Sequence, residues 1–251
     1  MTRLTVASLN TRGVPLFSSD LRSRYTAIAK AFETSDTDVV NLQEVFTYYH
    51  LRLLRTSMPS YRASFRPSAA GPAGGLVTFS RHPVTGNTYK RFPTPPVAEI
   101  RALPRMTRLT ASLQGMLRTG LPGITILNTH LSANRDGDWS PTSRYHGLQQ
   151  TQLTTLAQYA GTVEEPAVLT GDFNIARDSS LYRDFLGNSR LTDAFGDDCP
   201  PTFHQAYLPP DRPPHCIDFV LLSGPKLTVE SAHLDDSHPS DHLGLTVRLL
   251  I

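Results

Sequence analysis

The sequence contains little lysine, little net charge and no long apolar segment. Its three lysines are Lys30, Lys90 and Lys226, and its formal net charge of +2 is too small to indicate nucleic acid binding from electrostatics. No apolar run reaches the roughly 18 residues of a membrane-spanning helix. Arginine suits phosphate contacts, but we interpret its excess over lysine as compositional bias.

Cysteine is also scarce. Cys199 and Cys216 are the two cysteines, and they match no metal-binding or redox spacing. The first residues alternate like a strand and lack the apolar core of a signal peptide, so we expect a cytoplasmic protein with free thiols. Secretion stays open if the sequence is that of a mature form.

Length and composition fit a globular enzyme-sized domain. The 251 residues are 39% hydrophobic and 18% charged, which is enough for a sizeable core and excludes disorder. We expect a single domain over residues 1–251 and a monomer.

Short strand-like segments outnumber helical ones. We expect strands at 4–9, 38–43, three within 60–92, 106–117, 123–131, 167–172, 217–222, 227–234 and 243–250. Helices are expected from a Ser18-Ser19-Asp20 cap through Glu33, and at 46–57, 144–160 and 179–187, with a proline-rich connection at 93–104. This pattern predicts an α/β (α+β) fold with two mainly antiparallel sheets packed face to face and flanked by helices, not a doubly wound parallel sheet.

The segment Ala167–Asn174 combines a buried strand with a polar turn. Asp172 and Asn174 lie two positions apart after Gly171, so their side chains can address one point in space. Taken alone, Asp and Asn are more often ordinary turn formers. Polar side chains at the ends of other strands favour a functional interpretation.

Those polar side chains are distributed in a particular way. Four follow or close the ends of strands and three come at the beginnings of strands: Asn10, Glu44, His130 and Asp172, then Asp218, Asp241 and His242. In antiparallel sheets the end of one strand and the start of its neighbour lie at the same edge, so all seven are expected at one rim.

The same residues lie in six short motifs: Leu9-Asn10, Leu42-Gln-Glu44-Val, Asn128-Thr-His130-Leu, Gly171-Asp172-Phe-Asn174, Ile217-Asp218-Phe and Ser240-Asp241-His242. Their order resembles the endonuclease/exonuclease/phosphatase superfamily, the deoxyribonuclease-I-like phosphoesterases. The likeness is greatest to its sphingomyelinase-like and uncharacterised bacterial branches. The resemblance implies a four-layered α/β sandwich and a Mg²⁺-dependent enzyme, with Mn²⁺ or another divalent cation as alternatives.

The resemblance also implies roles for the metal side. Glu44 corresponds to the main metal ligand, with Asn10 in its shell, and carboxylate oxygens are what Mg²⁺ prefers. Asp241 is adjacent to His242 and points to the opposite face of an extended chain, which favours a place on the metal side or beside His130.

For catalysis, the resemblance implies a metal-activated water and a His-Asp pair. His242 corresponds to the general base, and its ordinary pKa of about 6.5 suits that task. Asp218 would orient it within hydrogen-bonding distance, while His130 and Asn174 would bind phosphoryl oxygens. Asp172 would position the water or serve the leaving group.

Three functions remain open. We favour hydrolysis of a phosphodiester or phosphomonoester in a small molecule or lipid headgroup, sphingomyelinase- or phospholipase-C-like, because no dense basic run is visible. The alternatives are a metal-dependent endo- or exonuclease acting on DNA or RNA, and a non-catalytic binding protein of the same fold. Gln149 stands where the resembled branches often carry arginine, for which Arg144 could substitute, and no amphipathic membrane-docking element is visible.

Overall fold

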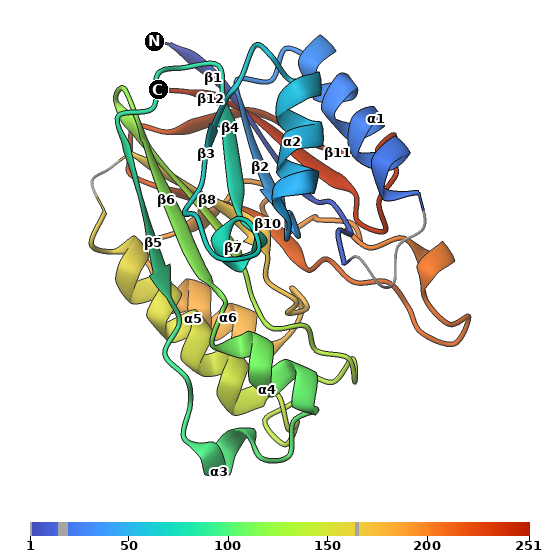
Figure 1. Ribbon diagram of the computed structural model, residues 1–251. Helices are drawn as coiled ribbons and strands as arrows, with labels where there is room; N and C mark the ends of the chain where they lie inside the picture. The colour runs from blue at the N-terminus through green and yellow to red at the C-terminus, as the bar shows by residue number, and fades with distance from the viewer. Residues whose placement is uncertain (1, 15–19, 164–165) are drawn as a thin grey trace.

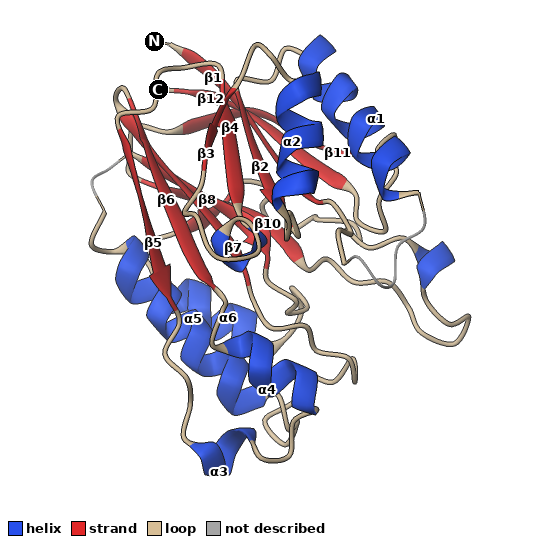
Figure 2. Ribbon diagram, viewed as in Figure 1, coloured by secondary structure: helices blue, strands red, loops and turns tan. Residues whose placement is uncertain are grey.

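Two six-stranded sheets pack face to face with helices on their outer faces (Figures 1 and 2). The computed structural model describes residues 2–14, 20–163 and 166–251. The first sheet has the order β11 (Thr228–Asp235), β12 (Gly244–Leu250), β1 (Arg3–Asn10), β2 (Val39–Gln43), β4 (Val77–Ser80) and β3 (Arg62–Ser64). Its neighbours are antiparallel except for β1 and β2, which run parallel.

The second sheet has the same plan. Its order is β5 (Gly86–Arg91), β6 (Gly115–Leu121), β7 (Ile124–His130), β8 (Ala167–Asp172), β10 (Asp218–Ser223) and β9 (Thr192–Asp193). The pair β7 and β8 is parallel and the other pairs are antiparallel. Both sheets are therefore mixed but mainly antiparallel, as predicted.

The helices form the two outer layers (Figure 2). On the first sheet lie α1 (Leu21–Thr34) and α2 (Tyr48–Ser57), and on the second lie α5 (His146–Ala160) and α6 (Ser180–Gly187). The short helices α3 (Val97–Ile100) and α4 (Arg105–Ala111) pack at the start of α5, and 3-10 turns occur at Ala73–Gly75 and Gln205–Tyr207. The four-layered sandwich is confirmed.

The space between the sheets changes from apolar to polar along the strands. Every second residue of a strand points to the same face, and four strands place three inward residues in the same order, apolar, then polar, then polar: Val6, Ser8, Asn10; Val39, Asn41, Gln43; Ile126, Asn128, His130; Val168, Thr170, Asp172. The apolar ends form the core between the sheets. The polar ends meet at one rim, so the packing that joins the sheets also gathers polar side chains there.

Buried amides connect the sheets below this rim. Gln43 Nε2 donates to Asn128 Oδ1 at 2.9 Å, and Asn41 Nδ2 donates to Thr170 Oγ1 at 2.8 Å. Asn128 Nδ2 in turn donates to the backbone carbonyls of Leu42 and Val77, both at 3.1 Å. A buried amide without a partner would cost about 1–3 kcal/mol, so these bonds fix the lateral register of one sheet on the other.

Two local predictions were wrong. Residues 106–111 belong to α4, not to a strand: Thr107 and Ala111 are buried one helical turn apart, and Ala111 packs with Tyr145 and Leu148 at the start of α5. The proline-rich connection also contains α3. Of the expected cap residues of α1, Ser18 and Ser19 lie outside the described residues, and Asp20 has a left-handed backbone (φ 54°) without a side-chain cap bond.

None of the helices in the described ranges combines the length and the apolar character needed to traverse a bilayer. The expectation of no transmembrane helix therefore agrees with the structure.

Gly171 determines how closely β7 and β8 approach at the rim. Its φ of 151° is unfavourable for other residues, and a Cβ there would lie 2.0 Å from the backbone oxygen of Thr129. Without a side chain at 171, the strands pair with His130 directly opposite Asp172.

We predict that Gly171→Ala lowers the free energy of unfolding by about 3 kcal/mol or more, because the added methyl group collides with backbone that cannot move independently. Gly187→Ala is the matched control, since a Cβ there meets no atom within 4 Å. Urea unfolding of both variants measures the difference. Equal stability of the two variants would show that the β7–β8 spacing does not depend on Gly171.

Candidate active site

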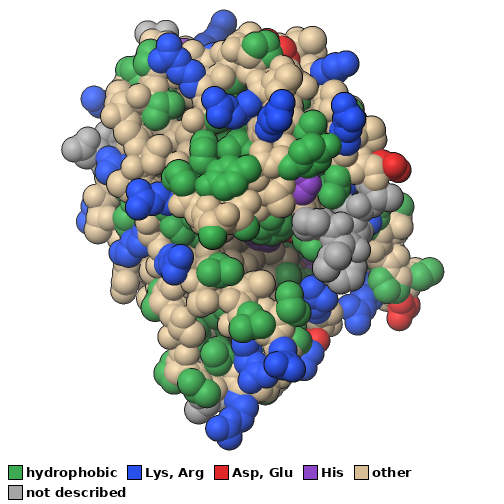
Figure 3. Space-filling view, in the orientation of Figure 1, with side chains coloured by type: hydrophobic (Ala, Val, Ile, Leu, Met, Phe, Trp, Pro, Cys, Tyr) green, Lys and Arg blue, Asp and Glu red, His purple; other side chains and the backbone are tan. Residues whose placement is uncertain are grey.

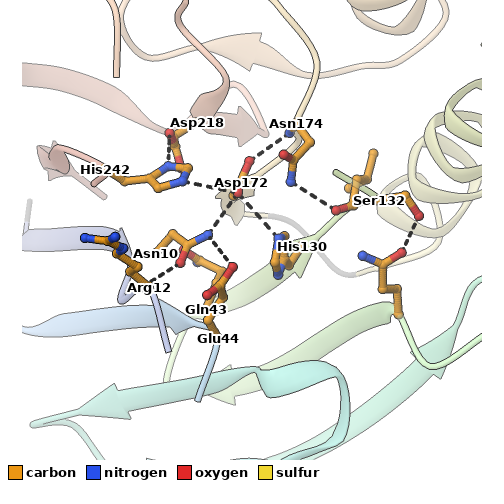
Figure 4. Close-up of polar contacts among 12 residues, drawn as sticks. Asn10, Arg12, Gln43, Glu44, His130, Ser132, Asp172, Asn174, Asp218 and His242 are labelled. Atoms are coloured by element: carbon orange, nitrogen blue, oxygen red, sulfur yellow. Dashed lines mark hydrogen bonds and ion pairs between the residues drawn. The ribbon is translucent and has the colours of Figure 1, made fainter. Parts of the chain in front are cut away.

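The polar rim brings together residues from both sheets (Figure 4). Strand pairing places Asp172 between His130 of β7 and Asp218 of β10. Asn10 ends β1 of the other sheet, and His242 lies just before β12. The convergence expected from strand ends and strand starts is confirmed for these residues.

Asp172 lies at the centre of the group and is 1% exposed. Its Oδ2 accepts a hydrogen bond from Asn10 Nδ2 at 3.0 Å and lies 3.4 Å from His130 Nε2 and 3.8 Å from His242 Nε2. Its Oδ1 accepts from the backbone N–H of Asn174 at 2.8 Å. Burial raises the pKa of the Asp172 carboxyl, and the neighbouring Asp218 carboxylate raises it further.

Asp218 and His242 form a buried pair. His242 Nδ1 lies 2.9 Å from Asp218 Oδ2, within the predicted distance, so the proton on Nδ1 points to the carboxylate and Nε2 faces Asp172. Burial alone would lower the pKa of His242, but the Asp218 and Asp172 carboxylates outweigh burial and raise it to about 10. The predicted proximity of Asp218 and His242 is confirmed.

Glu44 approaches the same point from the end of β2. Its Oε1 accepts from Asn10 Nδ2 at 3.3 Å, so one amide group lies between the carboxylates of Glu44 and Asp172. The backbone of Glu44 is left-handed (φ 63°), and its carbonyl accepts from the Tyr25 hydroxyl at 3.0 Å. A Cβ at position 13 would lie 1.9 Å from this carbonyl, which explains Gly13. Packing therefore holds Glu44 in an unfavourable conformation that turns the chain at the rim.

Asn174 is held by the loop and helix that follow β7. Its backbone is left-handed (φ 53°), and its carbonyl accepts from Trp139 Nε1 at 2.9 Å and from Gln149 Nε2 at 3.0 Å. Its own Nδ2 donates to the carbonyl of Leu131 at 3.1 Å. Gln149, where arginine was the expected residue, thus supports the turn that carries Asn174.

Asp241 and Arg144, two further residues named from the sequence, each lie beside an oppositely charged side chain. Asp241 Oδ2 lies 3.5 Å from Arg12 Nε, and its place as a metal ligand stays a prediction. Arg144 pairs with Asp136 at 2.7 Å on the surface, so it does not substitute for the arginine expected at position 149.

Thr202 was not found by sequence reasoning. Thr202 lies in the loop between β9 and β10 and is fully buried. Its hydroxyl donates to Asp218 Oδ2 at 2.6 Å and accepts from the backbone N–H groups of Ile217 and Asp218. No local pattern marked it, because its partner is distant in sequence. Near the same site, the guanidinium of Arg12, two residues after Asn10, stacks on the Tyr207 ring, 4.4 Å from its centroid.

The two cysteines are free, as expected, but they are neighbours. Their Sγ atoms lie 2.9 Å apart. Cys216 stands two residues before Asp218 in the sequence. The sequence spacing gave no sign of this contact.

The rim can hold a cation. Among the described residues, Asp172, Asp218 and His242 place ligand atoms within 4.8 Å of one another, and all three are buried. Asp218 and His242 already satisfy each other, whereas Glu44 and Asp172 present carboxylates to one neutral amide. The second arrangement offers carboxylate oxygens from two directions, the kind of ligand that a hard divalent cation prefers.

This chain combines a two-sheet sandwich with carboxylates and histidines gathered at one rim. The chain belongs to the Endonuclease/Exonuclease/phosphatase family, whose model matches residues 7–242. The match covers all the residues described at the rim.

Curated relatives include sphingolipid phospholipases. The chain is 28% identical over 220 residues to an inositol phosphosphingolipids phospholipase C of Schizosaccharomyces pombe, covering 83% of this chain and 49% of that protein. It is 23% identical over 198 residues to a "Putative neutral sphingomyelinase" of Drosophila melanogaster, covering 78% of this chain and 44% of that protein. The chain thus spans about half the length of the curated relatives it matches.

Solved structures share the fold. D. rerio TDP2 complexed with a single-strand DNA product has a TM-score of 0.76 at 17% identity, with all of both chains covered (100% each). Sphingomyelinase C from Streptomyces griseocarneus has a TM-score of 0.72 at 17% identity, with 99% of each chain covered. At this identity the likeness shows the fold alone.

We predict that Thr202→Val lowers the free energy of unfolding by about 1–3 kcal/mol, because two backbone N–H groups and one carboxylate lose their buried partner. Thr202→Ser keeps the hydroxyl group and serves as the matched control. Urea unfolding compares both with the parent protein. If Thr202→Val unfolds at the same urea concentration as the parent protein, the hydrogen bonds of the Thr202 hydroxyl group do not contribute to stability.

Proposed function

We propose that this protein is a divalent-metal-dependent phosphoester hydrolase, with magnesium as its metal. The single observation that supports this most is the buried Asp218–His242 pair, whose Nε2 faces a second carboxylate, Asp172, at the rim. A histidine oriented by one carboxylate is suited to move a proton at Nε2.

The metal would be held by Glu44 and Asn10, with Asp172 beside them. When bound, it would supply charge stabilisation for the phosphoryl oxygens and polarise the attacking water. The donors fit because two carboxylates converge on one amide of Asn10, whose rotation exchanges nitrogen for oxygen. Asp241, 3.5 Å from Arg12, is retained in the proposal as a ligand on the same side.

His242 would accept the proton of the attacking water at Nε2, while Asp218 holds Nδ1–H and stabilises the resulting imidazolium. The Asp172 carboxylate raises the pKa of His242 and so favours its protonated form. For His242 to act as a base, the negative charge of Asp172 must therefore be balanced by a cation. His130 and Asn174 would donate hydrogen bonds to phosphoryl oxygens, and Asp172 would position the water or serve the leaving group.

The substrate class we favour is a phosphodiester in a lipid headgroup. Two different curated relatives are described by sphingolipid names, and they cover most of this chain. A nuclease is the alternative, since a DNA-bound protein shares the fold. A non-catalytic binding protein is disfavoured because each motif residue retains a side chain able to perform its role.

We predict that Glu44→Ala reduces Mg²⁺-dependent hydrolysis of bis-p-nitrophenyl phosphate to less than about a tenth, because a ligand of the cation is lost. EDTA should abolish the activity of the parent protein. Glu230→Ala is the matched control, since Glu230 forms a surface ion pair with Arg3. Retention of activity by Glu44→Ala at saturating magnesium would remove Glu44 from the metal site.

For the substrate, we predict that hydrolysis of sphingomyelin or another phospholipid headgroup exceeds cleavage of single-stranded DNA and plasmid. Phosphatidylcholine and inositol phosphates complete the panel, and His242→Ala reports contaminating activity. Release of the headgroup phosphate and gel analysis of the DNA provide the measurements. Efficient plasmid nicking at physiological salt, with no lipid or inositol phosphate cleaved, would establish the nuclease alternative.

A further inference from the structure

Helix α4 exposes apolar side chains to solvent. Met106 and Leu109 are 63% and 65% exposed and lie three residues apart on one side of the helix, and Leu113, two residues after the helix ends, is 52% exposed. The opposite side of the helix is occupied, because Thr107 is buried and Ala111 packs with Tyr145 and Leu148 at the start of α5. Large exposed apolar side chains on one stripe mark an interaction surface.

Arginines flank the apolar stripe. Arg101 and Arg105 are exposed and Arg108 is half-buried, and none of the three forms an ion pair with an acidic side chain in the described ranges. By helical periodicity Arg105 and Arg108 lie next to Met106 and Leu109, whereas Arg101 precedes the helix. Helix α4 therefore places positive charge, without an acidic partner among the described residues, beside exposed aliphatic side chains.

The surrounding surface carries the same charge. Half of the 24 lysine and arginine residues lie between positions 45 and 135, together with one of the 22 acidic residues, Glu99. Figure 3 shows the face that carries α2 and α4: Lys and Arg outnumber Asp and Glu there, and hydrophobic side chains surround a hollow between the two helices. The near-zero net charge of the whole chain conceals this asymmetry.

Helix α4 is tied directly to the candidate active site. Gln114, three residues after the helix, accepts from the Ser132 hydroxyl at 2.5 Å and from Gln152 Nε2 at 3.1 Å. Ser132 lies two residues after His130, and its carbonyl accepts from Gln149 Nε2 at 3.3 Å. A ligand held on α4 would thus be held beside the rim.

We propose that α4 and its arginines dock this protein onto the surface of an anionic lipid bilayer, with the rim next to the headgroups. Aliphatic side chains would enter the acyl boundary and guanidinium groups would contact lipid phosphates, as in interfacial amphipathic helices. Nucleic acid fits this helix less well, because bases stack on aromatic rings and the exposed stripe of α4 is aliphatic. Only the use of docking in catalysis rests on the proposed function. Binding of α4 to a bilayer does not depend on it.

The test is vesicle flotation in EDTA, where no turnover occurs. Vesicles of phosphatidylcholine alone and with about a third phosphatidylglycerol are compared. We expect the parent protein to bind the anionic vesicles about tenfold more tightly than the neutral ones. Failure of the parent protein to float with anionic vesicles would overturn the proposal.

Two independent variants separate charge from apolar insertion. Arg105→Gln/Arg108→Gln should weaken binding to anionic vesicles about tenfold or more and leave neutral vesicles unaffected. Met106→Gln/Leu109→Gln should weaken binding to both by a similar factor. Arg183→Gln/Arg190→Gln is the matched control. It removes the same amount of charge from two exposed arginines, one in α6 and one three residues after it. Equal binding by all three variants would overturn the proposal.

Single-stranded DNA provides the competing ligand in the same assay. Loss of DNA binding in Arg105→Gln/Arg108→Gln with unchanged vesicle binding would assign the surface to nucleic acid instead. Hydrolysis of bis-p-nitrophenyl phosphate should be unchanged in both α4 variants, because neither touches the rim. Flotation without any hydrolysis by the parent protein would sink the proposed function and leave the docking surface standing.

Discussion

The buried carboxylate of Asp172 is the constraint on which the rest of the rim depends. A carboxylate that is 1% exposed must be compensated by neighbours, because burial without partners strongly disfavours the charged form. Asn10, His130 and His242 supply that compensation from three different strands or strand ends. A cation beside Glu44 would add to it, which gives the rim a physical reason to bind one.

The same constraint explains the architecture around the rim. Apolar inward residues join the sheets at one end, and buried amides join them further along, so the sheets cannot slide past each other. Gly171 and Gly13 permit backbone approaches that any side chain would block. Strained or close backbone is concentrated at Glu44, Gly171 and Asn174, next to the polar side chains that it orients.

Lipid docking and headgroup hydrolysis would use adjacent parts of one face. The chain of hydrogen bonds from Gln114 through Ser132 fixes α4 relative to the His130 loop. Such a link would let binding at a bilayer surface present headgroups to the rim without a large conformational change.

The sequence by itself determined the sheets, most helices and the set of polar residues at strand ends, because period-two burial and turn residues act locally. It even contained the apolar-to-polar order along four strands. Only the tertiary structure decided what faces what: Thr202 on Asp218, Cys199 on Cys216, and Arg144 on Asp136. Helix α4 was mistaken for a strand because its buried positions are defined by α5, about 40 residues away in sequence. Contacts between distant segments leave no local pattern, so residues that act through them become visible only in the folded chain.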